Sequence, residues 1–391
     1  MKKEKTLISN NIGLESIQSK GMTMKTQGSN RVVKTYRSKF AYLSTLLLLV
    51  AAAFTSRAQD VNFSQHYNSP TYYNPANVGL TQGLKVRLNS RRQWTGLSGE
   101  YSTYNFSADI AERSMPGAGG IGIIANQNIE GIGMLKTNVF GFIPSVRIPI
   151  SRNMIFQLGA LASVVTQQIN WDNLVFQDQL DPRWGNIGPS TFAGAARNKV
   201  TFPDFSIGGL FQFQGNNVEG TFGGAAHHLA EPNQSFFDVD ASLPMKFVYN
   251  MDFVINFAPD EDYYHKRKGF KLNPGVMVEH QRNLFLYSVG SNLYMSHIYL
   301  GLWYKNHTLR YDQFSSMIVM AGINILFTDA YRMKLMYSYE VNIYARQNIT
   351  GPSHELSLIL EFDDLGLVGK ERDIFVSPKS KTYSPIECSP F

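Results

Sequence analysis

Cysteine, charge and helical periodicity are all scarce in this chain of 391 residues. Cys388 is the single cysteine, so no internal disulfide can form. Charged residues make up 17% and aromatic residues 13%, which is charge-poor and aromatic-rich for a soluble domain. From Leu84 onward no long segment has apolar residues at helical spacing. Strands are therefore the elements that the sequence favours.

Motifs of catalysis and metal binding are also missing. The chain has no GxSxG motif, and His227 and His228, the only adjacent histidines, have no Cys, Asp or Glu at ligand spacing beside them. Residues 260–262 (DED) lack the spacing of a calcium loop. Several glycines precede no helix and are interpreted as hairpin and strand glycines, not as a phosphate cradle: Gly117, Gly119, Gly120 and Gly122. We expect no enzyme activity, no metal and no cofactor.

A leader is readable in the first 58 residues. Basic residues from Arg31 to Lys39 precede an apolar run at 40–54, and Ser56 and Ala58 place small residues where a signal peptidase reads. We predict cleavage between Ala58 and Gln59, with Met22 or Met24 as a possible true start. Ten of the 36 Lys and Arg and two of the 30 Asp and Glu lie in this leader, so the mature net charge is about −2. The mature chain therefore lacks the excess of positive charge that would favour nucleic-acid binding.

Period-two alternation recurs along the mature chain. In the first strand Lys85, Arg87 and Arg91 share one face, opposite Leu84, Val86 and Leu88. Fourteen strands are predicted, many of them long enough to cross a bilayer obliquely: 84–94, 100–112, 119–127, 135–149, 152–168, 199–213, 218–228, 243–257, 269–281, 284–293, 297–306, 314–325, 330–340 and 353–362.

A soluble sandwich also alternates, but in water the apolar face of so large a sheet would have nothing to cover it. Closure in lipid satisfies the backbone and leaves no edge, so the sequence favours an all-β transmembrane outer-membrane barrel of about 14 antiparallel strands. Aromatic residues near strand ends are interpreted as interfacial girdles: Trp94, Phe257, Trp303, Tyr304, Phe327 and Phe362.

The predicted organisation has four parts: a signal peptide (1–58), an irregular periplasmic segment (59–83), the barrel (84–362) and a polar periplasmic tail (363–391). An even strand number places both termini in the periplasm and the connections after odd-numbered strands outside. In residues 65–79, Pro70 and Pro75 argue against a strand interior and against a helix, and the aromatic residues need a surface to lie on.

Two groups of residues are candidates for binding a partner. The longest outward connection, predicted as structureless, spans 169–198 and contributes Trp171, Asp178, Gln179, Asp181, Pro182 and Trp184. Charged residues on inward faces contribute Lys85, Arg87, Arg91 and Glu355. The inward charges either bond to one another and fill the barrel or receive an inserted polypeptide.

Six stretches together resemble the PorP/SprF family of the type IX secretion system of the Bacteroidota. They occur in the family's order at 74–79 (NPANVG), 91–94 (RRQW), 178–182 (DQLDP), 202–208 (FPDFSIG), 299–305 (YLGLWYK) and 351–356 (GPSHEL). Pro352, inserted before Ser-His-Glu, and the long tail are departures from the family pattern.

The resemblance implies an outer-membrane barrel that works with the secretion machinery, and some family members pair with a large gliding adhesin. The expected function is non-catalytic anchoring of the C-terminal domain of a secreted cargo at the cell surface. The alternatives are a structural subunit of the machinery that binds periplasmic partners, or a passive solute channel.

Overall fold

The computed structural model describes residues 60–80, 83–111, 118–151, 153–186, 188–190, 197–237, 239–257, 270–295, 297–307, 315–328, 330–343 and 350–362. The predicted signal peptide, its cleavage site and the predicted tail lie outside the described residues. Within the described part of the chain, no helix is long and apolar enough to cross a membrane.

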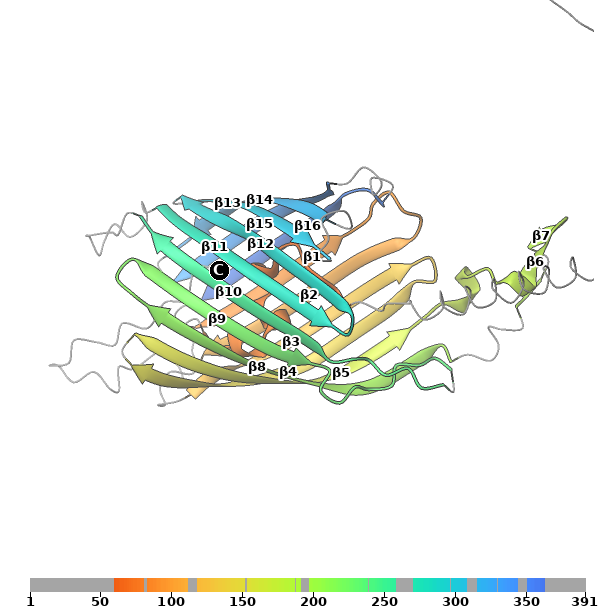
Figure 1. The fold of residues 1–391 in the computed structure, drawn as a ribbon, viewed down its shortest axis with the longest axis horizontal. Coiled ribbons are helices and arrows are strands. Elements are labelled where there is room, and N and C mark those ends of the chain that lie inside the picture. Colours follow the sequence, from red (N-terminus) through yellow and green to blue (C-terminus); the bar gives the residue numbers. More distant parts are fainter. Residues whose placement is uncertain are drawn as a thin grey trace, which may run out of the picture. The chain divides into compact units, whose positions relative to one another are not determined.

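Fourteen long strands close into one antiparallel barrel (Figure 1). Each strand pairs with its neighbours along the chain, and β1 closes the barrel by pairing with β16, from Leu84↔Phe362 to Arg92↔His354. The strands are β1 Leu84–Arg92, β2 Glu100–Ala111, β3 Ala118–Gly131, β4 Leu135–Ser151, β5 Met154–Gln168, β8 Lys199–Gln214, β9 Val218–His227, β10 Lys246–Asn256, β11 Phe270–Gln281, β12 Leu284–Met295, β13 Ile298–Asn306, β14 Ser315–Leu326, β15 Tyr331–Asn342 and β16 Ser353–Phe362.

The predicted closed barrel of fourteen antiparallel strands is confirmed, with shifts at the strand ends. β3 continues to Gly131 where the prediction ended at 127, and β10 begins at Lys246 where the prediction began at 243. The connection 169–198, predicted as structureless, contains a small hairpin of β6 Leu180–Asp181 and β7 Gly185–Asn186.

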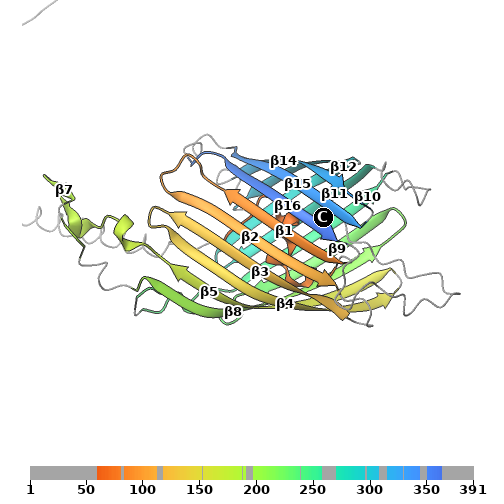
Figure 2. The same ribbon diagram turned by 180° about the vertical axis from the view of Figure 1, so that it is seen from behind.

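The two ends of the barrel are named here by what lies at them. β1 begins and β16 ends at the terminal end. β1 ends and β16 begins at the loop end, where the connections 169–198 and 228–245 also lie. Figure 2 shows β7 beyond the loop end.

Alternation divides every strand into an inward and an outward face. On β1, Lys85, Arg87 and Arg91 are buried inside the barrel, whereas Leu88 points outward and is 42% exposed. On β4 and β5, the outward residues Phe140 and Val164 are exposed. An outer wall of exposed apolar side chains around a polar interior is the arrangement that lipid contact requires.

Residues 60–80, called the plug below, lie inside the barrel. Fifteen of these 21 residues are buried and the other six are half-buried, and their orange ribbon lies within the ring of strands in both views (Figures 1 and 2). The plug has three short turns: η1 His66–Asn68, α2 Pro70–Tyr73 and η2 Pro75–Asn77.

The expectation that residues 65–79 contain no helix is wrong for one turn, α2. Pro70 and Pro75 stand at the first positions of α2 and η2, where the amide that proline lacks would have no partner within the helix. Proline therefore starts these turns. The surface that the aromatic residues of this segment require is the inner wall of the barrel.

Candidate functional site

The predicted inward charges form buried ion pairs. Lys85 Nζ lies 2.7 Å from Glu361 Oε1, and Arg87 pairs with Asp109 on the next strand. Arg91 lies between two carboxylates, 2.9 Å from Glu340 and 3.5 Å from Glu355. Lys85 and Arg87 therefore bond to carboxylates of the neighbouring strands β16 and β2, along the inner wall.

Arg91 and Glu355 pair with each other and also contact the plug. Glu355 Oε2 accepts hydrogen bonds from the backbone amides of Ser64 (2.7 Å) and Gln65 (3.2 Å). The Ser64 hydroxyl donates to Glu340 at 2.6 Å and also contacts Arg91. The inserted polypeptide that these charges hold is thus a segment of the same chain.

The start of the plug is fastened near the loop end. Lys305 Nζ donates to Asn62 Oδ1 at 3.2 Å, and the Asn62 amide donates to Glu279. Asp60 Oδ2 lies 2.9 Å from His228 Nε2 and 3.7 Å from Lys246 Nζ. Both contacts of Asp60 involve residues next to the loop-end tips of β9 and β10.

Aromatic packing fixes the middle of the plug. The rings of His66 and Tyr67 lie 4.8 Å and 4.9 Å from the ring of Trp303. Trp303 Nε1 donates to Asn292 at 2.9 Å. The predicted girdle position of Trp303 is therefore wrong. Trp303 shares the inward face of β13 with Lys305, and its side chain is 1% exposed.

The NPA sequence at 74–76 rests on glycines of the wall. The Asn74 side chain accepts from Ala76 N at 2.9 Å and donates to the carbonyls of Gly209 (3.1 Å) and Gly224 (3.4 Å). A Cβ atom at Gly208 would overlap Asn74 Oδ1, and one at Gly159 would lie 2.6 Å from Ala76 N. Glycine at these inward positions lets the plug backbone approach the wall.

The plug ends at the terminal end of the barrel. Ser145 Oγ donates to the Val78 carbonyl at 2.7 Å, and Gly79 N donates to Asp109 Oδ2 at 3.1 Å. Gly79 adopts a φ of 71° and packs against Gly120, where a Cβ atom would lie 2.7 Å from Gly79 Cα. Gly120, interpreted from sequence as a strand glycine, therefore also makes room for the plug.

Three of the predicted candidates in the 169–198 connection make their hydrogen bonds within that connection. Asp181 Oδ1 accepts from Arg183 N (2.7 Å) and Trp184 N (2.9 Å), and Asp178 accepts from the Ser190 hydroxyl at 2.9 Å. Gln179 accepts from Phe176 N at 2.8 Å and donates to the Gly188 carbonyl at 2.9 Å.

Trp171 joins the two long loops at the loop end. Its ring lies 6.1 Å from Phe236 and 5.7 Å from Phe237, and its Nε1 donates to the Arg197 carbonyl at 3.1 Å. Pro182 and Trp184 remain exposed at the hairpin tip, Trp184 at 71%. The structure therefore separates the candidates into hairpin-building residues and an exposed tip.

Comparison with known proteins identifies the family. The family described as "Type IX secretion system membrane protein PorP/SprF" matches residues 55–360. The chain belongs to the PorP/SprF family. No curated protein matches the chain.

Solved structures similar to this PorP/SprF protein include a Pseudomonas aeruginosa FadL homologue, with 11% identity, a TM-score of 0.40 and coverage of 76% of this chain and 94% of that chain. The CymD monoaromatic hydrocarbon channel has 10% identity, a TM-score of 0.40 and coverage of 78% and 93%. The Pseudomonas putida toluene transporter TodX has 10% identity, a TM-score of 0.34 and coverage of 77% and 93%.

Sequence reasoning missed the residues that seat the plug in this PorP/SprF protein. Ser64 and Gln65 carry no distinctive pattern, because their partners Glu340 and Glu355 lie more than 270 positions away. A usable signal existed in the strands: Gly120, Gly159 and Gly208 occupy inward positions of predicted strands, where a side chain would otherwise fill the barrel.

His228 provides a pH-dependent contact between plug and wall. It lies between Asp60 and Asp204, 2.9 Å from each, with His227 and Lys246 nearby. Burial lowers the pKa of His228, but Asp60 and hydrogen bonds to Asp204 and Asp60 outweigh it and raise the pKa to about 9. Burial raises the pKa of Asp60, but His228 and Lys246 outweigh it and hold that pKa below its ordinary value of 3.8.

We expect the start of the plug to loosen as the pH rises. The His228 contribution is complete below the ordinary histidine pKa of 6.5 and is lost as the pH passes about 9, whereas Asp60 loses its contribution only at acidic pH. Amide hydrogen exchange at residues 61–64, corrected for the intrinsic pH dependence, should accelerate between pH 6.5 and 9.5. His228→Asn should remove this step, and an equal step in that variant would contradict the assignment.

Proposed function

We propose that this protein is a non-enzymatic outer-membrane barrel of the type IX secretion system that anchors the C-terminal domain of a secreted cargo or gliding adhesin at the cell surface. The observation that carries this proposal is the contrast between an interior filled by the chain's own plug and an exposed hairpin at the loop end. Membership of the PorP/SprF family supports the secretion role.

The occupied interior favours a barrel that anchors a cargo protein over a passive solute channel. Buried ion pairs and hydrogen bonds fasten the plug from Asp60 near the loop end to Gly79 at the terminal end. We therefore assign Arg91 and Glu355 to holding the plug, and Lys85 and Arg87 to the interior pairs around it, instead of to direct cargo contact. A solute would have to displace this segment before it could pass.

Cargo contact is assigned to the loop end. An even strand number brings both barrel termini to one end, and a periplasmic position for them puts the 169–198 connection outside the cell. The β6–β7 hairpin of this connection exposes Trp184 and Leu180, and Val175 is exposed five residues before it, with Leu180 54% and Val175 57% exposed. Tryptophan is enriched among the residues that contribute most to binding at protein interfaces, so Trp184 is the expected anchor.

The test is purification of tagged barrel from outer membranes in mild detergent, with mass spectrometry of the bound protein. A stoichiometric secreted protein, bound through its C-terminal domain, is expected. Trp184→Ala combined with Leu180→Ala should lower its recovery by about tenfold or more, as loss of interface anchors does. A short Gly-Ser linker in place of 170–198 should abolish recovery.

The matched control is Trp94→Ala, which removes an exposed tryptophan from a different connection at the same end. Its recovery of cargo should equal that of the unaltered protein. Undiminished recovery from the hairpin variants would contradict the role of the loop. Recovery of periplasmic machinery without a secreted protein would favour the structural subunit instead.

A further inference from the structure

The outer wall differs between its two halves near the loop end. On β10, β12, β13 and β15 the outward side chains there include five tyrosines: Tyr249, Tyr287, Tyr304, Tyr337 and Tyr339. Aromatic residues at this level are expected at the boundary with lipid headgroups. Across β1 to β8 the corresponding row contains one tyrosine, Tyr104, and its other side chains are small or polar: Ser90, Gln127, Asn138, Thr166 and Thr201.

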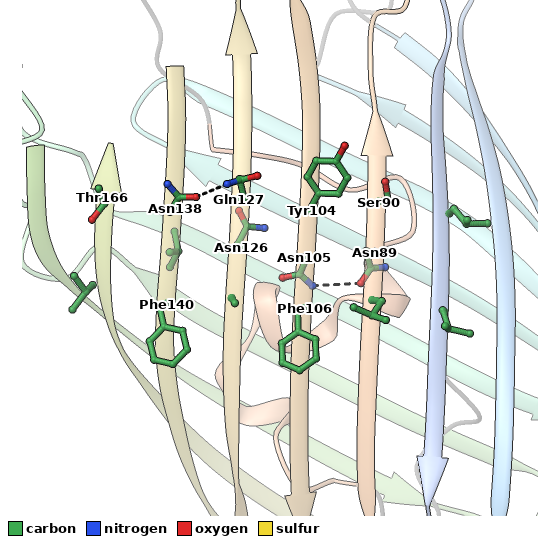
Figure 3. A pocket seen from close by; sticks show the side chains of 16 residues that line it. Asn89, Ser90, Tyr104, Asn105, Phe106, Asn126, Gln127, Asn138, Phe140 and Thr166 are labelled. Atoms are coloured by element: carbon green, nitrogen blue, oxygen red, sulfur yellow. Dashed lines mark hydrogen bonds between the residues drawn. The ribbon is translucent and has the colours of Figure 1, made fainter. Parts of the chain in front are cut away.

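A groove of about 680 Å³ lies along this row (Figure 3). Its apolar side is the next row toward the terminal end, in which Ala125 leaves a notch between Phe106 and Phe140. Its polar side includes Gln127 and Asn138, whose side chains hydrogen-bond to each other at 2.8 Å. The groove is thus largely apolar, with amide side chains on its side toward the loop end.

Cationic residues follow in the row beyond the polar one. The strand register aligns Arg92, Ser102, Ile129, Lys136, Gln168 and Lys199 in one outward row. At a strand separation of ~4.8 Å, Arg92 and Lys136 are roughly 14 Å apart and Lys136 and Lys199 roughly 10 Å. No acidic residue belongs to this row, so its net charge is positive.

We propose that this face binds a multiply acylated, phosphorylated glycolipid of the lipid A class. Acyl chains would lie over Phe106, Ala125 and Phe140, the polar linkage region beside Gln127 and Asn138, and phosphates beside Arg92, Lys136 and Lys199. From the terminal end toward the loop end, the wall presents apolar side chains, then amide side chains, then cationic side chains. Acyl chains, polar linkages and phosphates follow one another in the same order along such a lipid. Cations spread over six adjacent strands suit two separated phosphates better than the single phosphate of a glycerophospholipid.

The site is distinct from the cargo-binding hairpin, and only the choice of leaflet rests on the proposed orientation with the loop end outside. Binding in detergent requires neither that orientation nor a cargo. Failure of lipid binding would therefore leave the anchoring proposal untouched, and failure of cargo binding would leave the lipid site untouched.

Native mass spectrometry of the purified full-length protein in detergent tests the proposal, with bisphosphorylated lipid A as the probe. The triple variant Arg92→Gln, Lys136→Gln, Lys199→Gln should lower apparent affinity by about tenfold or more, because each cation near an anionic headgroup contributes independently. Ala125→Leu should lower it by filling the notch, with the cations intact. Heat-dependent migration on gels checks that each variant is folded.

The matched control is Ala321→Leu, the same change at an outward position of β14 on the other half of the wall. It should bind like the unaltered protein. Unchanged binding by both the triple variant and Ala125→Leu would overturn the site. Equal affinity for dephosphorylated lipid A or for phosphatidylglycerol would overturn the assignment to a bisphosphorylated glycolipid.

Discussion

Replacing Gly208 with valine is expected to open the barrel to ions. A Cβ atom at this position would overlap Asn74 Oδ1 and lie 3.0 Å from Pro75 Cδ. β8 is held on both sides by β5 and β9, so the Asn74 side chain must move. The hydrogen bonds that the Asn74 side-chain amide donates to the carbonyls of Gly209 and Gly224 would then be lost. Barrels of this size have room for a guest, and the emptied interior should conduct.

The measurement is single-channel conductance in planar bilayers. Gly208→Val should carry current on the order of ten times or more above the unaltered protein, as an unplugged barrel interior would. Gly209→Val is the matched control, because it adds the same side chain at the next residue but toward the outside, where a Cβ atom meets Phe156 at 3.5 Å. A folded Gly208→Val barrel that conducts no more than the control would show that the seat of Asn74 does not keep the interior closed.

Replacing Arg91 with methionine is expected to destabilise the protein strongly. Arg91 neutralises Glu340 and Glu355, and its removal leaves Glu355 with no ion pair among the described residues, though Lys305 remains 2.6 Å from Glu340. Removing one partner of a buried pair costs about 3–5 kcal/mol, because the remaining charge stays out of water. The backbone of Ser64 and Gln65 would also lose a fixed acceptor.

Arg92→Met makes the same substitution one residue later, where the side chain is exposed on the outer face. Surface changes of this kind usually alter stability by less than about 0.5 kcal/mol. Urea unfolding followed by heat-dependent gel migration compares the two variants. If Arg91→Met unfolds within about 1 kcal/mol of Arg92→Met, the Arg91 network is not a main support of the plug.

The strands were predictable because lipid and a polar interior impose opposite demands on alternate residues. That alternation places Lys85 and Arg87 inward and Leu88 outward from sequence alone. The same rule, applied strictly, would have placed Trp303 with Lys305 inside the barrel. The face of the strand is therefore a better guide to the side chain of Trp303 than its aromatic character near a strand end.

The position of residues 60–80 inside the barrel could not be predicted, because no sequence pattern within this segment specifies where it binds. Residues 60–80 make their bonds to strands spread from β1 to β16, so their conformation is a tertiary result. The β6–β7 hairpin, in contrast, has a local signal in the sequence. Asp181 before Pro182, with Gly185 at a φ of 73°, is ordinary turn chemistry that precedes a return strand.

The fastening of Ser64 by Glu340 and Glu355 sets an order of events during folding. The hydroxyl and the backbone amide of Ser64 obtain their acceptors from β15 and β16, across 276 and 291 positions of sequence. Contacts of such separation are slow to form because loop closure precedes any gain from them. β16 also completes the ring by pairing with β1. Seating of the plug and closure of the barrel therefore depend on the same last strand, and a chain that stops before β16 can complete neither.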